Sequence, residues 1–294
     1  MTTENFVSFP SPAKLNLFLH VVGQRSNGYH ELETVFQFLD YGDSIELCVN
    51  NSNKIEILTP IEGVKNSDNL IYKAAKLLQD QIEHNAGVQI KIHKVLPMGG
   101  GLGGGSSNAA TILLALNTLW NINLPVNQLA ELGLSLGADV PIFVKGYAAF
   151  AQGIGEVLTP VNPTEFWYLV SKPSCSISTQ DVFSSPNLVR NTPKLLVNNI
   201  TNTTDIDLHI EACHNDCETI VIKNYPKVAK LLAWLIEYAP SRMTGTGACI
   251  FSRFNSEHEA TKVQSTLPEG IESFVAKGIN QSPLVNAIKN LANK

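Results

Sequence analysis

The chain has 294 residues, 44% of them hydrophobic and 16% charged, a composition typical of a packed globular protein long enough for two domains. No apolar run reaches the roughly 18 residues of a membrane span, and a net charge of −5 argues against broad binding to nucleic acid or to a membrane surface. Five scattered cysteines and an N-terminal segment without signal-peptide character favour a cytoplasmic protein, in which the sequons at Asn199 and Asn202 are chance matches.

The first predicted strand covers residues 13–22, where leucines alternate with other residues. Side chains two positions apart on a strand share a face. The ammonium group of Lys14 and the amide group of Asn16 are therefore expected to project toward the same region. Further strands are expected at 34–40, 44–49, 55–58 and 88–95, with a helix from about Ser67 and Asp68 to residue 82 before the last of them.

The segment PMGGGLGGGSSNAAT at 97–111 holds six glycines and two serines between a strand pattern and a helix pattern. Glycines permit positive φ and let several backbone N–H groups converge on an anion, and the start of the following helix adds its positive dipole end. Ser106 or Ser107 is the expected N-cap of that helix. The segment, called the glycine loop below, therefore predicts a phosphate-binding site.

Other interpretations of the glycine loop fit less well. Gly99, Gly101 and Gly104 match the dinucleotide pattern GxGxxG, but that fold needs an acidic residue about 20 positions further on, where this sequence has none. A Walker A loop contains a lysine, which is missing here, and a protein kinase would also carry HRD and DFG segments. A flexible linker is disfavoured by the position between a strand and a helix. A phosphate loop of another nucleotide-binding class fits best.

The residues after the loop predict a helix at 109–120 and another at 127–136 that ends at Gly137. Because Pro141 disfavours a helical Val140, Asp139 is expected at a sharp exit that leads into a strand at 142–151. The Gly- and Pro-rich stretch 153–165 indicates a hinge between two halves, with a connecting strand as an alternative.

The C-terminal half alternates strands and helices. The pattern predicts strands at 167–172, within 241–254 and at 272–277, helices at 178–184, 215–238 and 256–266, and an Asn/Thr-rich loop at 191–207. Gly245-Thr246-Gly247 either braces the glycine loop or forms the turn between two strands. The whole chain thus reads as two α+β domains with a ligand site in the cleft between them.

Three segments resemble, in order, the three signatures of the GHMP kinases, the family of galactokinase, homoserine kinase, mevalonate kinase and phosphomevalonate kinase. SPAKLNLFL (11–19) resembles the first signature, the glycine loop the second, Pro-x-x-x-Gly-Leu-Gly-Ser-Ser, and MTGTGACIF (243–251) the third. Within the family the chain is most similar to the kinases of cytidine diphosphate methylerythritol in the non-mevalonate route to isoprenoid precursors. The further matching segments are GYHELETVFQFLDYGD (28–43), DNL (68–70), LGADVPIF (136–143), NDCE (215–218) and APSR (239–242).

The resemblance implies the α+β, two-domain GHMP kinase fold. Residues 1–160 would form an ATP-binding domain like domain 2 of ribosomal protein S5, and residues 161–294 a ferredoxin-like domain, with the active site between them. It implies transfer of the γ-phosphoryl group of ATP, with Mg²⁺, to the 2-hydroxyl of the methylerythritol unit. Two alternatives stay open: a kinase of this family that acts on a different alcohol, and a catalytically silent nucleotide-binding protein with the same fold.

The resemblance also implies roles for individual residues. Asp139 would accept the hydroxyl proton, and Lys14 would stabilise the developing alkoxide or the γ-phosphate. Tyr29, His30 and Phe183 would bind the cytosine, Asn16 the erythritol hydroxyls, and Phe36 is a further substrate contact. The ATP-binding residues would be Asn69, Lys94, Pro97, Met98, Gly99, Gly100, Gly101, Leu102, Gly103, Gly104, Gly105, Ser106 and Ser107. No metal ligand is predicted, because His209, Cys213, His214 and Cys217 lack the paired spacing of a zinc site.

Overall fold

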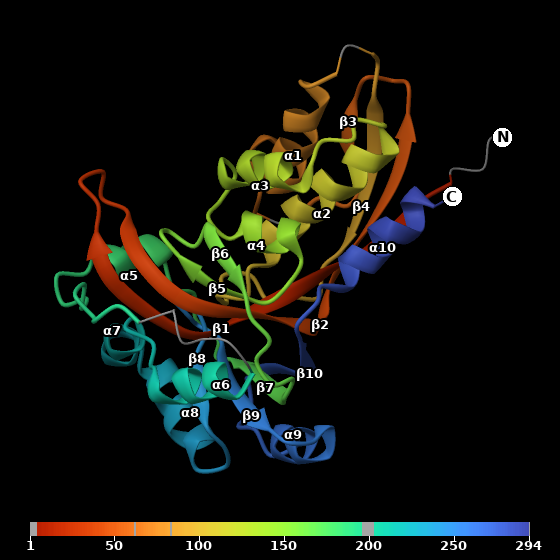
Figure 1. Cartoon of the computed structure of the whole chain (residues 1–294). Helices are drawn as coiled ribbons and strands as arrows, with labels where there is room; N and C mark the ends of the chain where they lie inside the picture. Colours follow the sequence, from red (N-terminus) through yellow and green to blue (C-terminus); the bar gives the residue numbers. More distant parts are fainter. Residues whose placement is uncertain (1–4, 62, 83, 196–202, 294) are drawn as a thin grey trace.

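The computed structural model describes residues 5–61, 63–82, 84–195 and 203–293, and its elements confirm the α+β class (Figure 1). Within those residues one ten-stranded sheet has the order β3-β4-β2-β10-β7-β9-β8, while β1 pairs with β2, and β5 pairs with β2 and β6. The strands are β1 (Val7–Gln24), β2 (His30–Asn50), β3 (Ile55–Ile57), β4 (Gly87–His93), β5 (Ala149–Gln152), β6 (Val157–Pro160), β7 (Trp167–Lys172), β8 (Ser241–Met243), β9 (Ile250–Phe254) and β10 (Glu272–Ile279).

Helices cover the sheet in two groups, and the long strands β1 and β2 run between α1–α4 and α6–α9 (Figure 1). The first group contains α1 (Leu70–Gln79), α2 (Gly104–Leu119), α3 (Val126–Leu134) and α4 (Val140–Lys145). The second half contributes α5 (Thr179–Ser184), α6 (Thr203–Ala212), α7 (Glu218–Asn224), α8 (Pro226–Ile236), α9 (Glu257–Gln264) and α10 (Pro283–Ala292). In the described part of the chain no helix is both long and apolar enough to cross a membrane.

The hydrophobic core explains why α2 lies at the centre of the first group. All residues from Ser107 to Asn117 are buried, and a helix that is buried all round must be covered on every side. It packs on α1, α4 and β1, with Ile112, Leu113 and Leu116 fully buried. The glycine loop, whose residues from Gly104 onward form the start of α2, is thereby attached to this close-packed core.

The strand pair β1–β2 is longer than the sequence pattern indicates. Separate strands at 34–40 and 44–49 were expected, but β2 runs through both. The chain can continue because Gly42 lies directly opposite Pro12 on β1, where an added Cβ would come within 2.2 Å of the Ser11 carbonyl oxygen. Only a glycine allows this close backbone approach.

Prolines and a glycine also set helix limits that the sequence analysis placed wrongly. Helix α2 starts at Gly104, with Gly103 (φ 72°) at the N-cap, so neither Ser106 nor Ser107 caps it. Pro141 lies in the first turn of α4, where a proline is tolerated, and residues 142–145 are therefore helical instead of extended. Pro226 begins α8 and divides the expected helix 215–238 into α7 and α8.

The remaining expectations from the sequence have different outcomes. The strands at 167–172, 241–254 and 272–277, the helices at 178–184 and 256–266, and the connecting strand in the hinge are confirmed. Helix α10 was not predicted, and 203–207, expected in a loop, begin α6. Residues 196–202 of that loop, including the asparagines of both sequons, lie outside the described residues. The domain boundary at 160/161 stays a prediction. Elements after this boundary contact elements before it, because β10 pairs with β2 as well as with β7, and α10 packs on β1 and α2.

A buried carboxylate fixes the start of the glycine loop. The side chain of Asp43 is fully buried and accepts hydrogen bonds from the backbone N–H groups of Val95 and Leu96, both at 2.9 Å. Its second oxygen accepts from Lys94 Nζ at 2.7 Å and from Asn108 Nδ2 at 3.1 Å. One residue of β2 thus holds the end of β4 and the first turns of α2 together.

Asp43→Ala is expected to lower the free energy of unfolding by about 3–5 kcal/mol, because four donors lose this acceptor and the bonds from Leu96 and Asn108 are fully buried. Urea denaturation of the full chain measures this loss. Asp80→Ala is the matched control: Asp80 is 57% exposed and paired with Lys76, so it is expected to cost less than about 1 kcal/mol. Equal losses for the two variants would contradict the structural role of Asp43.

Candidate active site

Lys14 and Asp139 form an ion pair, with Lys14 Nζ 3.2 Å from Asp139 Oδ2. The Lys14 side chain is only 3% exposed, whereas that of Asp139 is 35% exposed. The ammonium group also donates to Asn16 Oδ1 at 2.6 Å and to the Gly101 carbonyl at 3.0 Å. The ammonium thus makes two hydrogen bonds within the protein in addition to the ion pair, and the exposed member of the pair is the carboxylate.

Neighbouring elements bring these groups together. Lys14 and Asn16 share one face of β1, as the strand pattern predicts, and the Lys14 backbone N–H donates to the Leu102 carbonyl at 3.0 Å. Asp139 is the N-cap residue of α4, at the exit from the turn that follows α3. The prediction that Asp139 lies in a turn is confirmed, although the turn leads into a helix.

The glycine loop is shaped by positive φ angles at Gly99, Gly101 and Gly103. At Gly101 (φ 77°) a Cβ would lie 2.3 Å from the Thr244 carbonyl oxygen. The backbone of the glycine loop therefore lies directly against the backbone at Thr244. A Cβ on Gly100 would lie 2.5 Å from Cys249 Sγ. Burial raises the pKa of that thiol to about 12, which keeps it uncharged beside the loop.

The turn between β8 and β9 braces the loop, so both interpretations of Gly245-Thr246-Gly247 hold. The N–H groups of Ala248 and Cys249 donate to the carbonyls of Gly99 and Gly100 at 3.3 and 3.2 Å. The turn is held in its place by Asn215, whose amide donates to the Met243 and Gly245 carbonyls, both at 2.8 Å.

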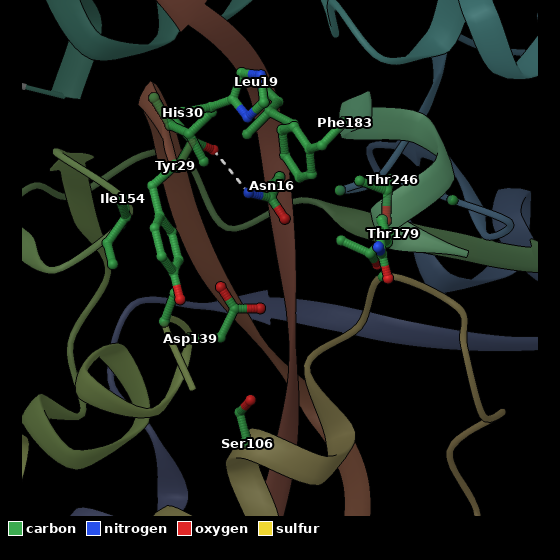
Figure 2. Close-up of a pocket in the computed structure, with 18 of the residues that line it drawn as sticks. Asn16, Leu19, Tyr29, His30, Ser106, Asp139, Ile154, Thr179, Phe183 and Thr246 are labelled. Carbon is green, nitrogen blue, oxygen red and sulfur yellow. Dashed lines mark hydrogen bonds between the residues drawn. The ribbon is translucent and has the colours of Figure 1, made fainter. Parts of the chain in front are cut away.

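A cavity of about 700 Å³ lies beside the ion pair and is called the large cavity (Figure 2). Residues of both halves of the chain line it. They include Lys14, Asn16, Tyr29, His30, Phe36, Ser106, Asp139, Ile154, Thr179, Phe183 and Thr246. In Figure 2, Ser106 and Asp139 lie at one end, His30 and Phe183 lie at the other, and the Tyr29 side chain extends toward Asp139.

The far end of the large cavity is aromatic. The rings of His30 and Phe183 are stacked, with centroids 4.9 Å apart and planes at 27°. Tyr29 is 58% exposed and faces the same cavity. Burial and the charge of Arg190 lower the pKa of His30, so the imidazole is neutral near pH 7. Two rings and a neutral imidazole suit a flat, polar-edged ligand.

A second cavity of about 370 Å³, called the loop groove, lies along the glycine loop. Its lining includes every loop residue from Pro97 to Ser106, together with Asn69 and Lys94. Asn69 caps α1 by accepting from the Ile71 N–H at 3.0 Å, and its buried Nδ2 has no hydrogen-bond partner among the described residues. An unsatisfied buried donor beside a groove suits a ligand acceptor.

The structure brings the predicted residues together with one exception. Ser107 is fully buried, and its hydroxyl accepts from Ser11 Oγ at 2.9 Å, so it lines neither cavity. Phe36 is 2% exposed but lies under the Lys14 ammonium, 5.2 Å from its ring centroid.

The sequence analysis missed Thr179 and Arg190. Thr179 pairs through its hydroxyl with Thr246 at 3.0 Å, and Arg190 contacts His30. No pattern in the sequence marks either residue, because the contacts that bring them to the cavity, with Thr246 and His30, join segments distant in the chain.

Two family models match the chain. The model of the GHMP kinases N terminal domain matches residues 69–147, and the model of the GHMP kinases C terminal matches residues 188–272. A curated relative from Colwellia psychrerythraea, named 4-diphosphocytidyl-2-C-methyl-D-erythritol kinase, is 59% identical over 97% of this chain and 94% of its own length. A relative of the same name from Aliivibrio fischeri is 56% identical over 94% and 93% of the two chains.

Solved structures show the same fold. The crystal structure of a 4-(cytidine 5'-diphospho)-2C-methyl-D-erythritol kinase superposes with a TM-score of 0.77 at 28% identity, over 92% of this chain and 99% of that one. A homoserine kinase from Cytophaga hutchinsonii superposes with a TM-score of 0.68 at 14% identity, over 96% and 97% of the two chains, a likeness of fold alone.

Gly101→Ala is expected to destabilise the fold more than Gly99→Ala, and the pair separates steric contact from backbone strain. Both residues have positive φ, but a Cβ on Gly99 meets nothing within 4 Å. We expect a loss of about 1 kcal/mol for Gly99→Ala and about 2 kcal/mol more for Gly101→Ala, measured by chemical denaturation. Equal losses would mean that the loop moves away from Thr244 at no cost.

Proposed function

We propose that this chain, which belongs to the GHMP kinase family, transfers the γ-phosphoryl group of ATP to the 2-hydroxyl of 4-diphosphocytidyl-2-C-methyl-D-erythritol. The chain is an enzyme, an ATP-dependent phosphotransferase. The substrate is the one that the names of its relatives give, at 56–59% identity over nearly the whole chain. The products are the 2-phosphate and ADP, and the reaction belongs to the non-mevalonate route to isoprenoid precursors.

The observation that carries the proposal is the junction of the two cavities at the ion pair. Gly99, Gly101 and Ser106 line both the loop groove and the large cavity. Lys14, which bonds to the Gly101 carbonyl, and Asp139 lie at this junction. A nucleotide in the groove and an alcohol in the large cavity would therefore meet beside one ammonium and one carboxylate.

ATP would lie in the loop groove with its phosphates on the backbone N–H groups of the loop. The first N–H groups of α2 have no partner within the helix, and the helix dipole favours an anion there. Asn69 and Lys94 line the part of the groove beyond the loop, where the adenosine end would extend. Lys94 is held by Asp43, so its cation has a fixed position.

Mg²⁺ would accompany ATP. The phosphates and water supply most ligands of this ion in kinases, with one or two protein oxygens. The hydroxyl of Ser106 and the carboxylate of Asp139 lie at the same end of the large cavity (Figure 2) and are oxygen donors of the kind it binds. When bound, the ion neutralises charge on the transferred phosphoryl group.

The chemical step needs a base, a cation and alignment. Asp139 would accept the proton of the 2-hydroxyl while the new O–P bond forms and the bond to the leaving ADP oxygen breaks with its electron pair. Lys14 would stabilise the charge on the phosphoryl oxygens or on the alkoxide. Because Asn16 and the Gly101 carbonyl hold the ammonium, Lys14 keeps its position when the carboxylate takes the proton.

The cytidine end would occupy the aromatic end of the large cavity. A cavity of about 700 Å³ has the size of a small-molecule site. Tyr29 and Phe183 offer ring faces for stacking, and His30 offers a hydrogen bond to the base edge. Asn16 lies between this end and the junction and would meet the erythritol hydroxyls.

Two alternatives, a kinase that acts on a different alcohol and a nucleotide-binding protein without activity, are less well supported. A kinase of a different alcohol would not need the aromatic end, and a silent nucleotide-binding protein would not need Lys14 and Asp139 side by side. The proposal places the enzyme in the cytoplasm, since all five cysteines are free thiols.

Asp139→Asn is expected to lower kcat by about two orders of magnitude or more, because the amide cannot accept the proton, with little change in ATP affinity. Coupled ADP release measures kcat, and calorimetry with an ATP analogue measures the affinity. Asp80→Asn, on an exposed carboxylate of α1's C-terminal end, is the control. If kcat survives in Asp139→Asn, Asp139 is not the base and polarisation by Lys14 carries the step.

Removing the side chains of Tyr29 and His30 tests whether the site binds a cytidine group, which distinguishes the proposed substrate from other alcohols. The variant with both residues changed to alanine is expected to lose cytidine diphosphate binding at least about tenfold and to keep ATP binding. Calorimetry measures both ligands. The control changes the exposed Tyr238 and His258 to alanine, which should alter neither affinity. Unchanged binding of cytidine diphosphate in the first variant would contradict the proposed cytidine site.

A further inference from the structure

Arg190 connects the His30 side chain with the backbone of the segment that carries Phe183. Its Nε donates to His30 Nε2 at 3.0 Å, and one Nη1 hydrogen is donated to the Leu188 carbonyl at 3.0 Å. Both Nη2 hydrogens are donated at 2.8 Å, one to the Phe183 carbonyl and one to the Ser185 carbonyl. Four of the five N–H groups of a guanidinium are thus used, and its orientation is fixed.

The contact with Arg190 determines which ring nitrogen of His30 carries the proton. A guanidinium only donates, so Nε2 must accept with its lone pair. An imidazolium would oppose one N–H with another and place two cations 3 Å apart. The neutral ring therefore carries its hydrogen on Nδ1, and the low pKa that burial and Arg190 give His30 agrees with this form.

His30 lines the large cavity, and Nδ1 is the ring nitrogen that the contact with Arg190 leaves for a ligand. Within the described residues no group is hydrogen-bonded to Nδ1, while the ring lines the cavity and stacks on Phe183. Figure 2 shows His30 and Phe183 together at the end of the cavity opposite Ser106. The group available to a ligand is thus an N–H donor, and the positive charge of Arg190 beside Nε2 strengthens it as a donor.

We propose that Arg190 is a positioning residue that fixes His30 as an Nδ1–H donor and thereby makes the cavity select cytosine over uracil. Cytosine has a bare N3 and an O2 on its pairing edge, which accept hydrogen bonds. Uracil carries a hydrogen on N3, which would face the Nδ1–H group as a second donor. The inference rests on the proposed function, which supplies the cytidine ligand.

A purely structural role for Arg190 makes a different prediction. By bonding the carbonyls of Phe183 and Ser185, Arg190 also closes the C-terminal end of α5. If that were its only effect, its loss would displace Phe183 and weaken stacking of any base. Both pyrimidines would then be affected equally, whereas loss of the tautomer affects their ratio.

The test measures binding of cytidine 5′-diphosphate and uridine 5′-diphosphate to the full chain by calorimetry, with the ATP site filled by a non-hydrolysable ATP analogue. The wild type is expected to favour the cytidine nucleotide. In Arg190→Met this preference is expected to fall about tenfold, the loss of one hydrogen bond of fixed polarity. An unchanged ratio, or equal weakening of both ligands, would overturn the proposal.

Two further variants complete the design. His30→Asn replaces the imidazole by an amide, which has no tautomer to set, so Arg190→Met in that background should leave the base ratio unchanged. A ratio that still falls there would show that Arg190 does not act through the tautomer of His30 and would overturn the proposal. Arg253→Met is the matched control, because Arg253 pairs with Glu211 and stacks on Phe166 and lines neither cavity.

The tautomer of His30 can be measured directly, without any substitution of Arg190. In the wild-type chain labelled with ¹⁵N-histidine, the His30 signals, assigned by their loss in His30→Asn, should show the hydrogen on Nδ1. A hydrogen on Nε2 overturns the inference. If the tautomer and the base preference are as expected but the methylerythritol substrate is not phosphorylated, the proposed function fails and the role of Arg190 stands.

Discussion

The arrangement of the site depends on one buried cation. Lys14 is 3% exposed, and an ammonium group without water needs its hydrogen bonds from the protein. Asn16 and the Gly101 carbonyl accept its hydrogen bonds and Asp139 pairs with its charge, and these groups come from β1, the glycine loop and the start of α4. The cation therefore determines how three separate segments lie relative to one another, and it supplies the positive charge that the glycine loop itself lacks.

The same constraint ties the two halves of the chain together. Asn16 accepts from Lys14 through its side chain and donates to Thr244 Oγ1 through its backbone at 2.9 Å. The turn that follows Thr244 braces the glycine loop, and Asn215 holds that turn. The cavities are consequently formed where the two halves meet. A substitution of the distant Asn215 would therefore alter the glycine loop through the backbone contacts of the turn.

Features of the site that arise from residues close together in the sequence could be predicted. Contacts between segments that are distant in the sequence mostly could not. The alternation in β1 placed Lys14 and Asn16 on one face, and the loop between strand and helix predicted the phosphate site. That Lys14 and Asp139 belong to one site followed only from family resemblance, since 125 positions separate them in the sequence, and their ion pair is seen in the structure. Arg190 was missed because its effect arises from contacts with His30 and with the carbonyls that end α5, and no local pattern encodes such a set.

The ion pair also bears on how a buried lysine can act in the proposed reaction. In the free site Asp139 lies on the exposed side of the pair, so an incoming alcohol reaches the carboxylate before the ammonium. A γ-phosphoryl group delivered along Gly99, Gly101 and Ser106 would approach the ammonium from the loop groove. As the carboxylate takes the proton and loses its charge, the ammonium would exchange the carboxylate for phosphoryl oxygens while Asn16 and Gly101 keep it in place. The desolvation of Lys14 is thus completed on folding, and in the proposed reaction the transition state would meet a cation that Asn16 and Gly101 already hold in place.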